Sequence, residues 1–276
     1  MDTINEFTEK DHMQKENLAE NFVHCVTRTQ IVSIFVIAFL VLLPVSLMNI
    51  STFDEGFIVT GADLIRFGKV PYVDFISNYG PAQYYLIAFL YTVFGPDLLV
   101  SRLAHVFTLG CLVALVFSLS AKISGGINRE MPYITAFLCT CFILIARPNA
   151  NYPALAATVF LLGATYYCSR GLPSLSTRHL IFASSLIAVA GLFRWDFGIY
   201  GVVALGFTVL LVLFWNRQPR ARWYLAMAAS FLPAGLISAL IYVPLLIRSN
   251  ADRIRRYSTG GRACDPERQA GPAGAP

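Results

Sequence analysis

One short apolar stretch decides how this chain is arranged in space: residues 81–94 read PAQYYLIAFLYTVF, between the turn sequences YGP and GPD. The stretch is shorter than the roughly 20 apolar residues that a membrane-spanning helix needs. Pro81 suits the first position of a helix, and Tyr84, Tyr85 and Tyr91 suit the depth of lipid headgroups. We therefore predict a helix over 81–94 that lies in a membrane interface without crossing the membrane.

The composition of the chain predicts an integral membrane protein. Of its 276 residues, 56% are hydrophobic and 13% are charged, and the mean hydropathy is +0.60. A soluble domain has a much lower apolar share. The formal net charge of +5 comes from basic residues scattered over short loops, which argues against a nucleic-acid partner. The six cysteines have neither the spacing of a zinc site nor that of a disulfide framework.

Long apolar segments predict an all-α polytopic fold with about seven transmembrane helices. The predicted spans are residues 31–50, 98–121, 132–146, 152–168, 180–193, 197–215 and 223–247. Pro233 and Pro244 are expected to kink the last one. The polar residues 1–30 precede an apolar segment without a cleavage site, so we expect a cytoplasmic tail followed by a transmembrane domain over 31–247.

The distribution of basic residues predicts the orientation. If 81–94 lies flat, most Lys and Arg residues fall on the side of the N-terminus. The opposite side holds Arg66, Lys69, Arg147 and Arg194, with Arg102 at the boundary. Cytoplasmic loops are usually the more basic ones, so we expect a cytoplasmic N-terminus in the cell (inner) membrane and an extracytoplasmic loop over 51–97.

That loop is the longest connection between predicted spans, and long ordered loops are commonly functional. A second short helix is expected over about 56–67, with Asp54 as its N-cap and Gly68 at its end. The expected inner face of this helix consists of Phe57, Gly61, Leu64 and Ile65. The loop is thus predicted to hold two interfacial helices.

Several motifs in this region occur in order: FDEGF, GADLIRFGKVPYVDF and NYGPAQYYLIAFLYTVFGPDLLVSRL, then RWDFGIY further on. Together they resemble the bacterial GT-C membrane glycosyltransferases, the group that includes the lipid A aminoarabinose transferase and the rhizobial lipopolysaccharide galacturonosyltransferases. The resemblance covers roughly 31–214 and is strongest from Asp54 to Arg102. It implies an enzyme of GT-C fold that transfers a hexosyl or pentosyl group outside the cytoplasmic membrane. The implied partners are a polyprenyl-phosphate sugar donor, a cell-envelope acceptor (lipid, polysaccharide or protein) and membrane lipids.

An acceptor hydroxyl that attacks a sugar needs a carboxylate to take its proton. Asp54 matches the acidic first-loop position of the family and is the candidate base. Glu55 is expected to assist it, or to hold a divalent cation with Asp54 as a further metal ligand. The leaving lipid phosphate calls for a cation, for which Arg147, Arg194 and Lys69 are the candidates.

Asp74, Tyr79 and Asp196 complete the set of substrate-binding candidates, with Asp74 and Tyr79 shaping an acceptor pocket. Each assignment has a structural alternative. Asp54 could be only a helix cap, and Asp74 could belong to an ordinary turn. Arg147 and Arg194 could snorkel at span ends. Residues two apart do not share a helical face, so Arg194 and Asp196 need not pair.

Other side chains are expected to be structural: Tyr84 and Tyr85 as interfacial anchors, and His105 as a satisfied core residue. A transporter or flippase for an envelope precursor is the alternative function. It would show charges at mid-membrane or repeated halves, and the sequence has neither. Residues 248–276 are rich in Gly, Pro, Ala and Arg, and are predicted to be an unstructured tail of aberrant or truncated origin, so that this chain is an incomplete form of low activity.

Overall fold

The computed structural model describes residues 27–48, 54–124, 128–148, 151–174, 176–215, 232, 235–248 and 251. This part of the chain is 85% helical and contains no strand, which confirms the all-α prediction. The helices are α2 (Arg28–Met48), α3 (Asp54–Arg66), α4 (Pro81–Phe94), α5 (Leu98–Ile123), α6 (Met131–Ala146), α7 (Pro153–Ser174), α8 (Thr177–Phe193) and α9 (Trp195–Trp215), followed by a helix over Gly235–Arg248.

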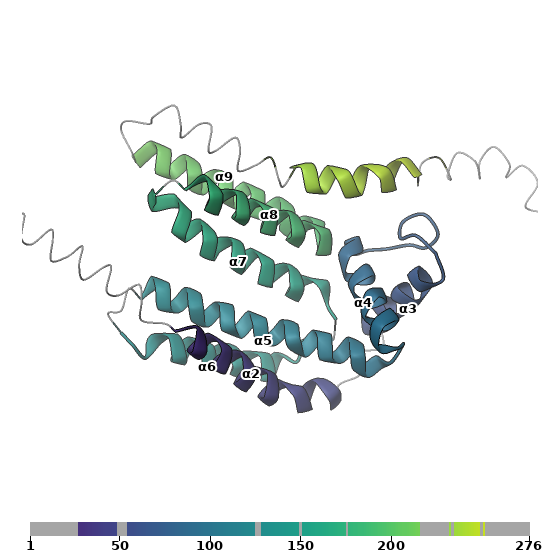
Figure 1. The fold of residues 1–276 in the computed structure, drawn as a ribbon, viewed down its shortest axis with the longest axis horizontal. Helices are drawn as coiled ribbons and strands as arrows, with labels where there is room; N and C mark the ends of the chain where they lie inside the picture. Colours follow the sequence, from purple (N-terminus) through teal and green to yellow (C-terminus); the bar gives the residue numbers. More distant parts are fainter. Residues whose placement is uncertain are drawn as a thin grey trace, which may run out of the picture.

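Six of these helices form an up-and-down bundle, while α3 and α4 lie together at one end of it (Figure 1). One core joins α2, α5 and α6 around Leu42, Leu109 and Phe117. Another joins α7, α8 and α9 around Ala183 and Ile187. Short connections make successive helices antiparallel neighbours. The bundle therefore brings every second connection to the end where α3 and α4 lie.

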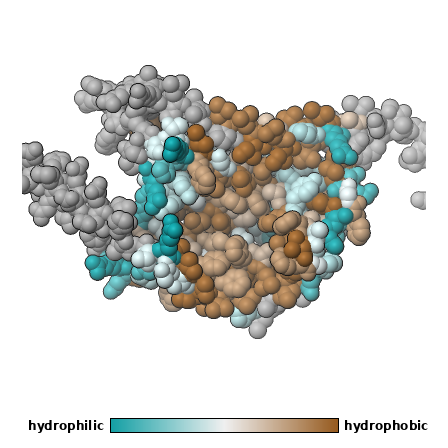
Figure 2. Space-filling view, viewed as in Figure 1, coloured by the Kyte–Doolittle hydropathy of each residue, from teal (hydrophilic) through white to brown (hydrophobic). Residues whose placement is uncertain are grey.

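Among the described residues, three helices are long and apolar enough to cross a membrane, over Arg28–Ser46, Leu98–Ile123 and Trp195–Val212. Figure 2 shows a broad hydrophobic band between two hydrophilic edges, an arrangement compatible with a membrane protein. Six of the seven predicted spans correspond to helices. The last predicted span, 223–247, falls partly outside the described residues, and Pro233 lies outside them too. That the chain crosses the membrane seven times therefore stays a prediction. The predicted tail over 248–276 is described only at two positions, and residues 1–26 lie outside the description.

The first loop contains the two predicted short helices. α4 has the predicted bounds, and Gly68, with a φ of 80°, follows the end of α3. The predicted inner face of α3 is right at Gly61 but wrong at Phe57, which is 38% exposed: the buried residues are Glu55, Ile58, Gly61 and Ala62. The physical reason is that Glu55 has a charged partner inside the fold and that Gly61 admits the ring of Tyr84, within 2.6 Å of the position of an added Cβ.

The tyrosines of α4 are divided between core and surface. Tyr84 and Tyr91 are buried, at 0% and 2% exposure, in the small core between α3 and α4. The prediction that Tyr84 is an interfacial anchor is therefore wrong, because its ring packs against Gly61 and Phe75. Tyr85, which is 44% exposed, remains available for that role.

Candidate functional site

The carboxylate of Asp54 lies in the first turn of α3 and is half-buried. It accepts a hydrogen bond from the hydroxyl of Tyr79, with 2.7 Å between the two oxygens. Burial, and then this bond to Asp54, raise the pKa of Tyr79 above its usual 10.0, so the phenol stays neutral and donates. The main-chain oxygen of Tyr79 accepts from Ser77 and Tyr72, which fixes the loop that carries it.

Glu55, the next residue, has a different environment. Its side chain is 3% exposed, and its two oxygens accept from Nε and Nη2 of Arg102 at 2.9 and 3.1 Å. This fork geometry is the strongest form of carboxylate recognition by arginine. Glu55 thus ties the start of α3 to α5, and the predicted acidic pair is split into one half-exposed and one buried carboxylate.

Arg194 lies between α8 and α9 in an extended conformation, with φ −146°. Its Nε and Nη2 donate to Asp196 at 3.0 and 2.7 Å, and its Nη1 donates to the hydroxyl of Tyr152 at 2.6 Å. The spacing argument that Arg194 and Asp196 need not pair does not apply, because Arg194 precedes the helix in which Asp196 occupies the first turn. Residues from two distant segments therefore hold this guanidinium.

Two tyrosines connect the acidic and the basic parts of the site. The rings of Tyr79 and Tyr152 meet edge to face, with centroids 6.0 Å apart. Tyr79 contacts Asp54 through its hydroxyl, and Tyr152 contacts Arg194 through its own. We call Asp54, Tyr79, Tyr152 and Arg194 the tyrosine-linked series. It spans the first loop, the start of α7 and the α8–α9 junction.

Gly80 holds the first loop against the end of α8. Its N–H donates to the carbonyl of Phe193 at 3.0 Å, directly before Arg194. A Cβ at this position would lie 2.0 Å from the carbonyl oxygen of Leu192, so only glycine fits. The sequence NYGP therefore places Tyr79 in the site by allowing two backbones to touch.

The remaining predicted substrate-binding residues lie on the surface at this end of the bundle. Lys69 is exposed beyond the end of α3, and Arg147 is exposed at the end of α6 with a φ of 44°. Asp74 is exposed too, and its carboxylate accepts from the N–H of Val70 at 2.7 Å. That bond supports the turn interpretation of Asp74.

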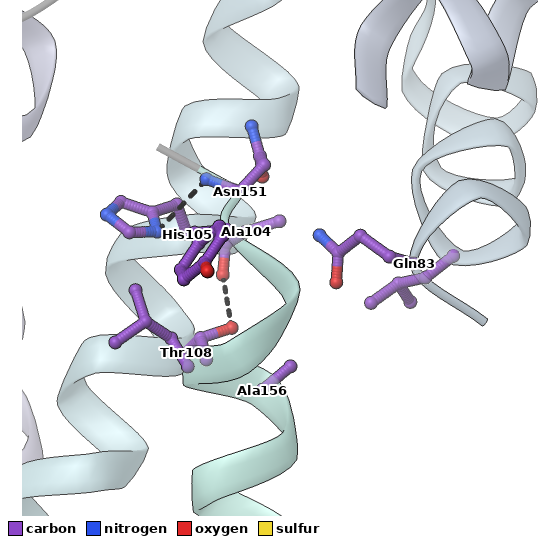
Figure 3. A pocket seen from close by; sticks show the side chains of 9 residues that line it. Gln83, Ala104, His105, Thr108, Asn151 and Ala156 are labelled. Atoms are coloured by element: carbon purple, nitrogen blue, oxygen red, sulfur yellow. Dashed lines mark hydrogen bonds between the residues drawn. The ribbon is translucent and has the colours of Figure 1, made fainter. Parts of the chain in front are cut away.

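A small pocket beside Tyr152 was not predicted. It is lined mainly by α4, α5 and the start of α7, and its polar side chains include Gln83, His105 and Asn151 (Figure 3). His105 is the buried core residue that was expected, and its Nδ1 accepts from the N–H of Asn151 at 3.2 Å. The signal in the sequence was a glutamine within an otherwise apolar helix.

The residues present do not form a protein cage for the predicted divalent cation. Across the described ranges, no group of three or more His, Cys, Asp or Glu side chains is placed to hold a metal. Asp54 has Glu55 as its neighbour in sequence, but that carboxylate is bound to Arg102.

Comparisons of the chain with family models, with curated proteins and with solved structures each gave no match. The function is accordingly inferred from the residues and their geometry.

Proposed function

We propose that this protein is a membrane-embedded glycosyltransferase of GT-C type. It would move a sugar from a polyprenyl-phosphate donor to a hydroxyl of a cell-envelope acceptor, on the extracytoplasmic face of the inner membrane. The observation that supports this proposal is the tyrosine-linked series. It combines a carboxylate, Asp54, with a guanidinium, Arg194, at one end of an apolar helical bundle.

In the proposed reaction the acceptor oxygen attacks the anomeric carbon of the sugar. A new glycosidic bond forms there, and the bond from that carbon to the phosphate oxygen breaks with its electron pair leaving on the lipid phosphate. Asp54 takes the proton of the acceptor hydroxyl. Tyr79 orients Asp54, since its neutral phenol donates to that carboxylate.

Glu55 acts in this proposal as a positioning residue. Its buried fork with Arg102 fixes the first turn of α3, and thereby the backbone of Asp54. Arg194 faces the developing charge on the phosphate, but it shares its own charge with Asp196. Lys69 and Arg147, both exposed at the same end, add the positive potential that attracts a lipid phosphate.

The test is sugar transfer from short-chain prenyl-phosphate donors by protein purified from its native membrane. We expect Asp54→Asn to lower kcat by about a hundredfold or more, because the amide cannot accept the proton. Asp63→Asn on the same helix is the matched control, and it should keep wild-type activity because the carboxylate of Asp63 is exposed and pairs with exposed Arg66. Undiminished transfer by Asp54→Asn would remove Asp54 as the base.

A flippase for an envelope precursor is the second candidate. The buried polar side chains of Gln83, His105 and Asn151 between apolar helices favour it, since such groups line substrate paths in transporters. Vesicles that move a fluorescent lipid-linked sugar across the bilayer without transferring the sugar would support the flippase.

A further inference from the structure

The pocket beside Tyr152 has an unusual chemical character. Gln83 reaches from α4 into the space between α5 and α7, where Asn151, His105 and Thr108 lie (Figure 3). Gln83 is 5% exposed and Asn151 is 3% exposed. Both amides are therefore buried well inside the described fold, yet they border a space that atoms do not fill.

Three atoms of these two amides lack hydrogen-bond partners within the described part of the chain. The atoms concerned are Oε1 of Gln83, and Oδ1 and Nδ2 of Asn151. The backbone of Asn151 is fixed, since its N–H donates to His105 and its φ is 61°. A buried polar group without a partner costs free energy, so these three atoms call for a hydrogen-bonding group in the pocket.

The pocket also contains no formal charge. Its lining is Gln83, Leu86, Ala104, His105, Thr108, Asn151, Tyr152, Leu155 and Ala156, without a carboxylate, an ammonium or a guanidinium. Nδ1 of His105 accepts a hydrogen bond, which assigns the neutral tautomer with its proton on Nε2. A charged ligand group in this pocket would lose its hydration without gaining a counter-ion.

The size of the pocket limits what enters it. The pocket has room for about one water molecule, because the centre of that molecule could move within about 10 Å³. One hydroxyl group fits that space, whereas a whole sugar ring does not. Tyr152 lines the pocket and belongs to the tyrosine-linked series, so a ring whose hydroxyl enters the pocket would lie against Tyr152, on the side of Arg194.

We propose that the pocket formed by Gln83, Asn151 and Tyr152 binds one hydroxyl group of an uncharged sugar on the donor. The pocket then selects neutral sugars over sugars that carry a carboxylate or an ammonium at the same position. This inference rests on the proposed function, because it takes the lipid-linked sugar as the ligand. It goes beyond that function by naming the class of sugar.

The experiment measures binding to purified protein in lipid nanodiscs. The probes are a short-chain prenyl phosphate without sugar and the same lipid carrying glucose, glucuronate or 6-amino-6-deoxyglucose, so that both charged groups replace the same hydroxyl. We expect the glucose form to bind about tenfold more tightly than the two charged forms, as one satisfied buried hydrogen bond permits. Gln83→Leu should abolish this preference and leave binding of the bare lipid phosphate unchanged.

The control variant is Tyr85→Leu, on the exposed side of the same helix, which should keep the preference. Equal affinities of wild type for the neutral and charged forms would overturn the inference while leaving the proposed glycosyltransferase in place. A preference for the neutral sugar that persists in Gln83→Leu would also overturn the inference and leave the proposed glycosyltransferase in place. The pocket would then hold only water. Failure of every probe, the bare lipid phosphate included, would overturn both the proposed function and this inference.

Discussion

Glu55 and Arg102, 47 positions apart in sequence, form a buried bidentate ion pair that joins α3 to α5. Their side chains are 3% and 8% exposed. On the same helix, Asp63 and Arg66 form a pair of similar length whose side chains are 40% and 28% exposed. The two pairs allow the effect of burial to be measured with nearly the same chemistry.

The first prediction concerns the buried pair. Arg102→Met should lower the free energy of unfolding by about 3–5 kcal/mol, because it leaves the carboxylate of Glu55 buried without a partner. Arg66→Met, the exposed equivalent, should change it by less than about 1 kcal/mol. Thermal unfolding in detergent, followed by tryptophan fluorescence, measures both. Equal effects would show that the Glu55–Arg102 pair is not buried in the folded protein.

The second prediction concerns Gly80. Gly80→Ala should displace the first loop from the end of α8, because the new methyl group would overlap the carbonyl of Leu192. A fall in melting temperature and loss of sugar transfer are the expected results. Gly56→Ala is the matched control: no atom lies within 4 Å of its added Cβ, and alanine favours a helix by about 1 kcal/mol. Retained stability and transfer in Gly80→Ala would contradict the close contact.

The third prediction is a pH dependence at Tyr79. Because burial and Asp54 raise its pKa above 10.0, the neutral phenol stabilises the fold fully below that pH, and this contribution is lost as the pH rises through the folded pKa. Asp54→Asn should lower the pKa of Tyr79, so that the phenolate forms at a lower pH. Tyrosine ring carbon-13 NMR measures the titration, and Tyr79→Phe assigns the signal. An unchanged titration of Tyr79 in Asp54→Asn would contradict the hydrogen bond between the two side chains.

The fourth prediction concerns the guanidinium at the α8–α9 junction. Arg194→Lys keeps the charge but cannot donate in a fork to Asp196 and also to Tyr152. Transfer should fall by about tenfold to a hundredfold in kcat/KM for a prenyl-phosphate sugar. Arg178→Lys, exposed near the start of α8, should have no effect. Equal kinetics of the two variants would exclude Arg194 from the reaction.

The fifth prediction concerns topology. In a cysteine-free background, a single cysteine at exposed Asn78 should react from outside intact cells with a membrane-impermeant maleimide. One at exposed Arg129 should react only after the membrane is opened. These results are expected if α3 and α4 lie on the extracytoplasmic side. Reaction of both positions in intact cells would contradict the predicted orientation.

Much of the helical framework was predictable because it depends on local properties. Apolar length places the bundle helices, and Pro81 with Gly95 delimits α4. Gly68 marks the end of α3, because its positive φ is a conformation that favours glycine and ends a helix. These signals lie within a few residues of the boundaries they define, so a single sequence suffices to read them.

The site was predictable only in part, because its contacts join distant segments. Asp54, Tyr79, Arg194 and Asp196 were selected from motifs, and the structure places them in contacts with one another or through Tyr152. The buried fork of Glu55 with Arg102 was missed, since nothing local shows that a carboxylate will turn inward. The pocket at Gln83 was missed likewise, because it exists only where α4, α5 and α7 meet.

The contact of Gly80 with Phe193 also has a consequence for biosynthesis. Helices α4 to α7 and nearly all of α8 lie between the two residues in the chain, so the first loop leaves the ribosome long before its docking partner exists. Until α8 is in place, Tyr79 does not have the α8–α9 junction, with Arg194, beside it. The site is therefore completed late in synthesis, and we expect the first loop of a nascent chain stalled within α7 to be more sensitive to added protease than that of the full chain.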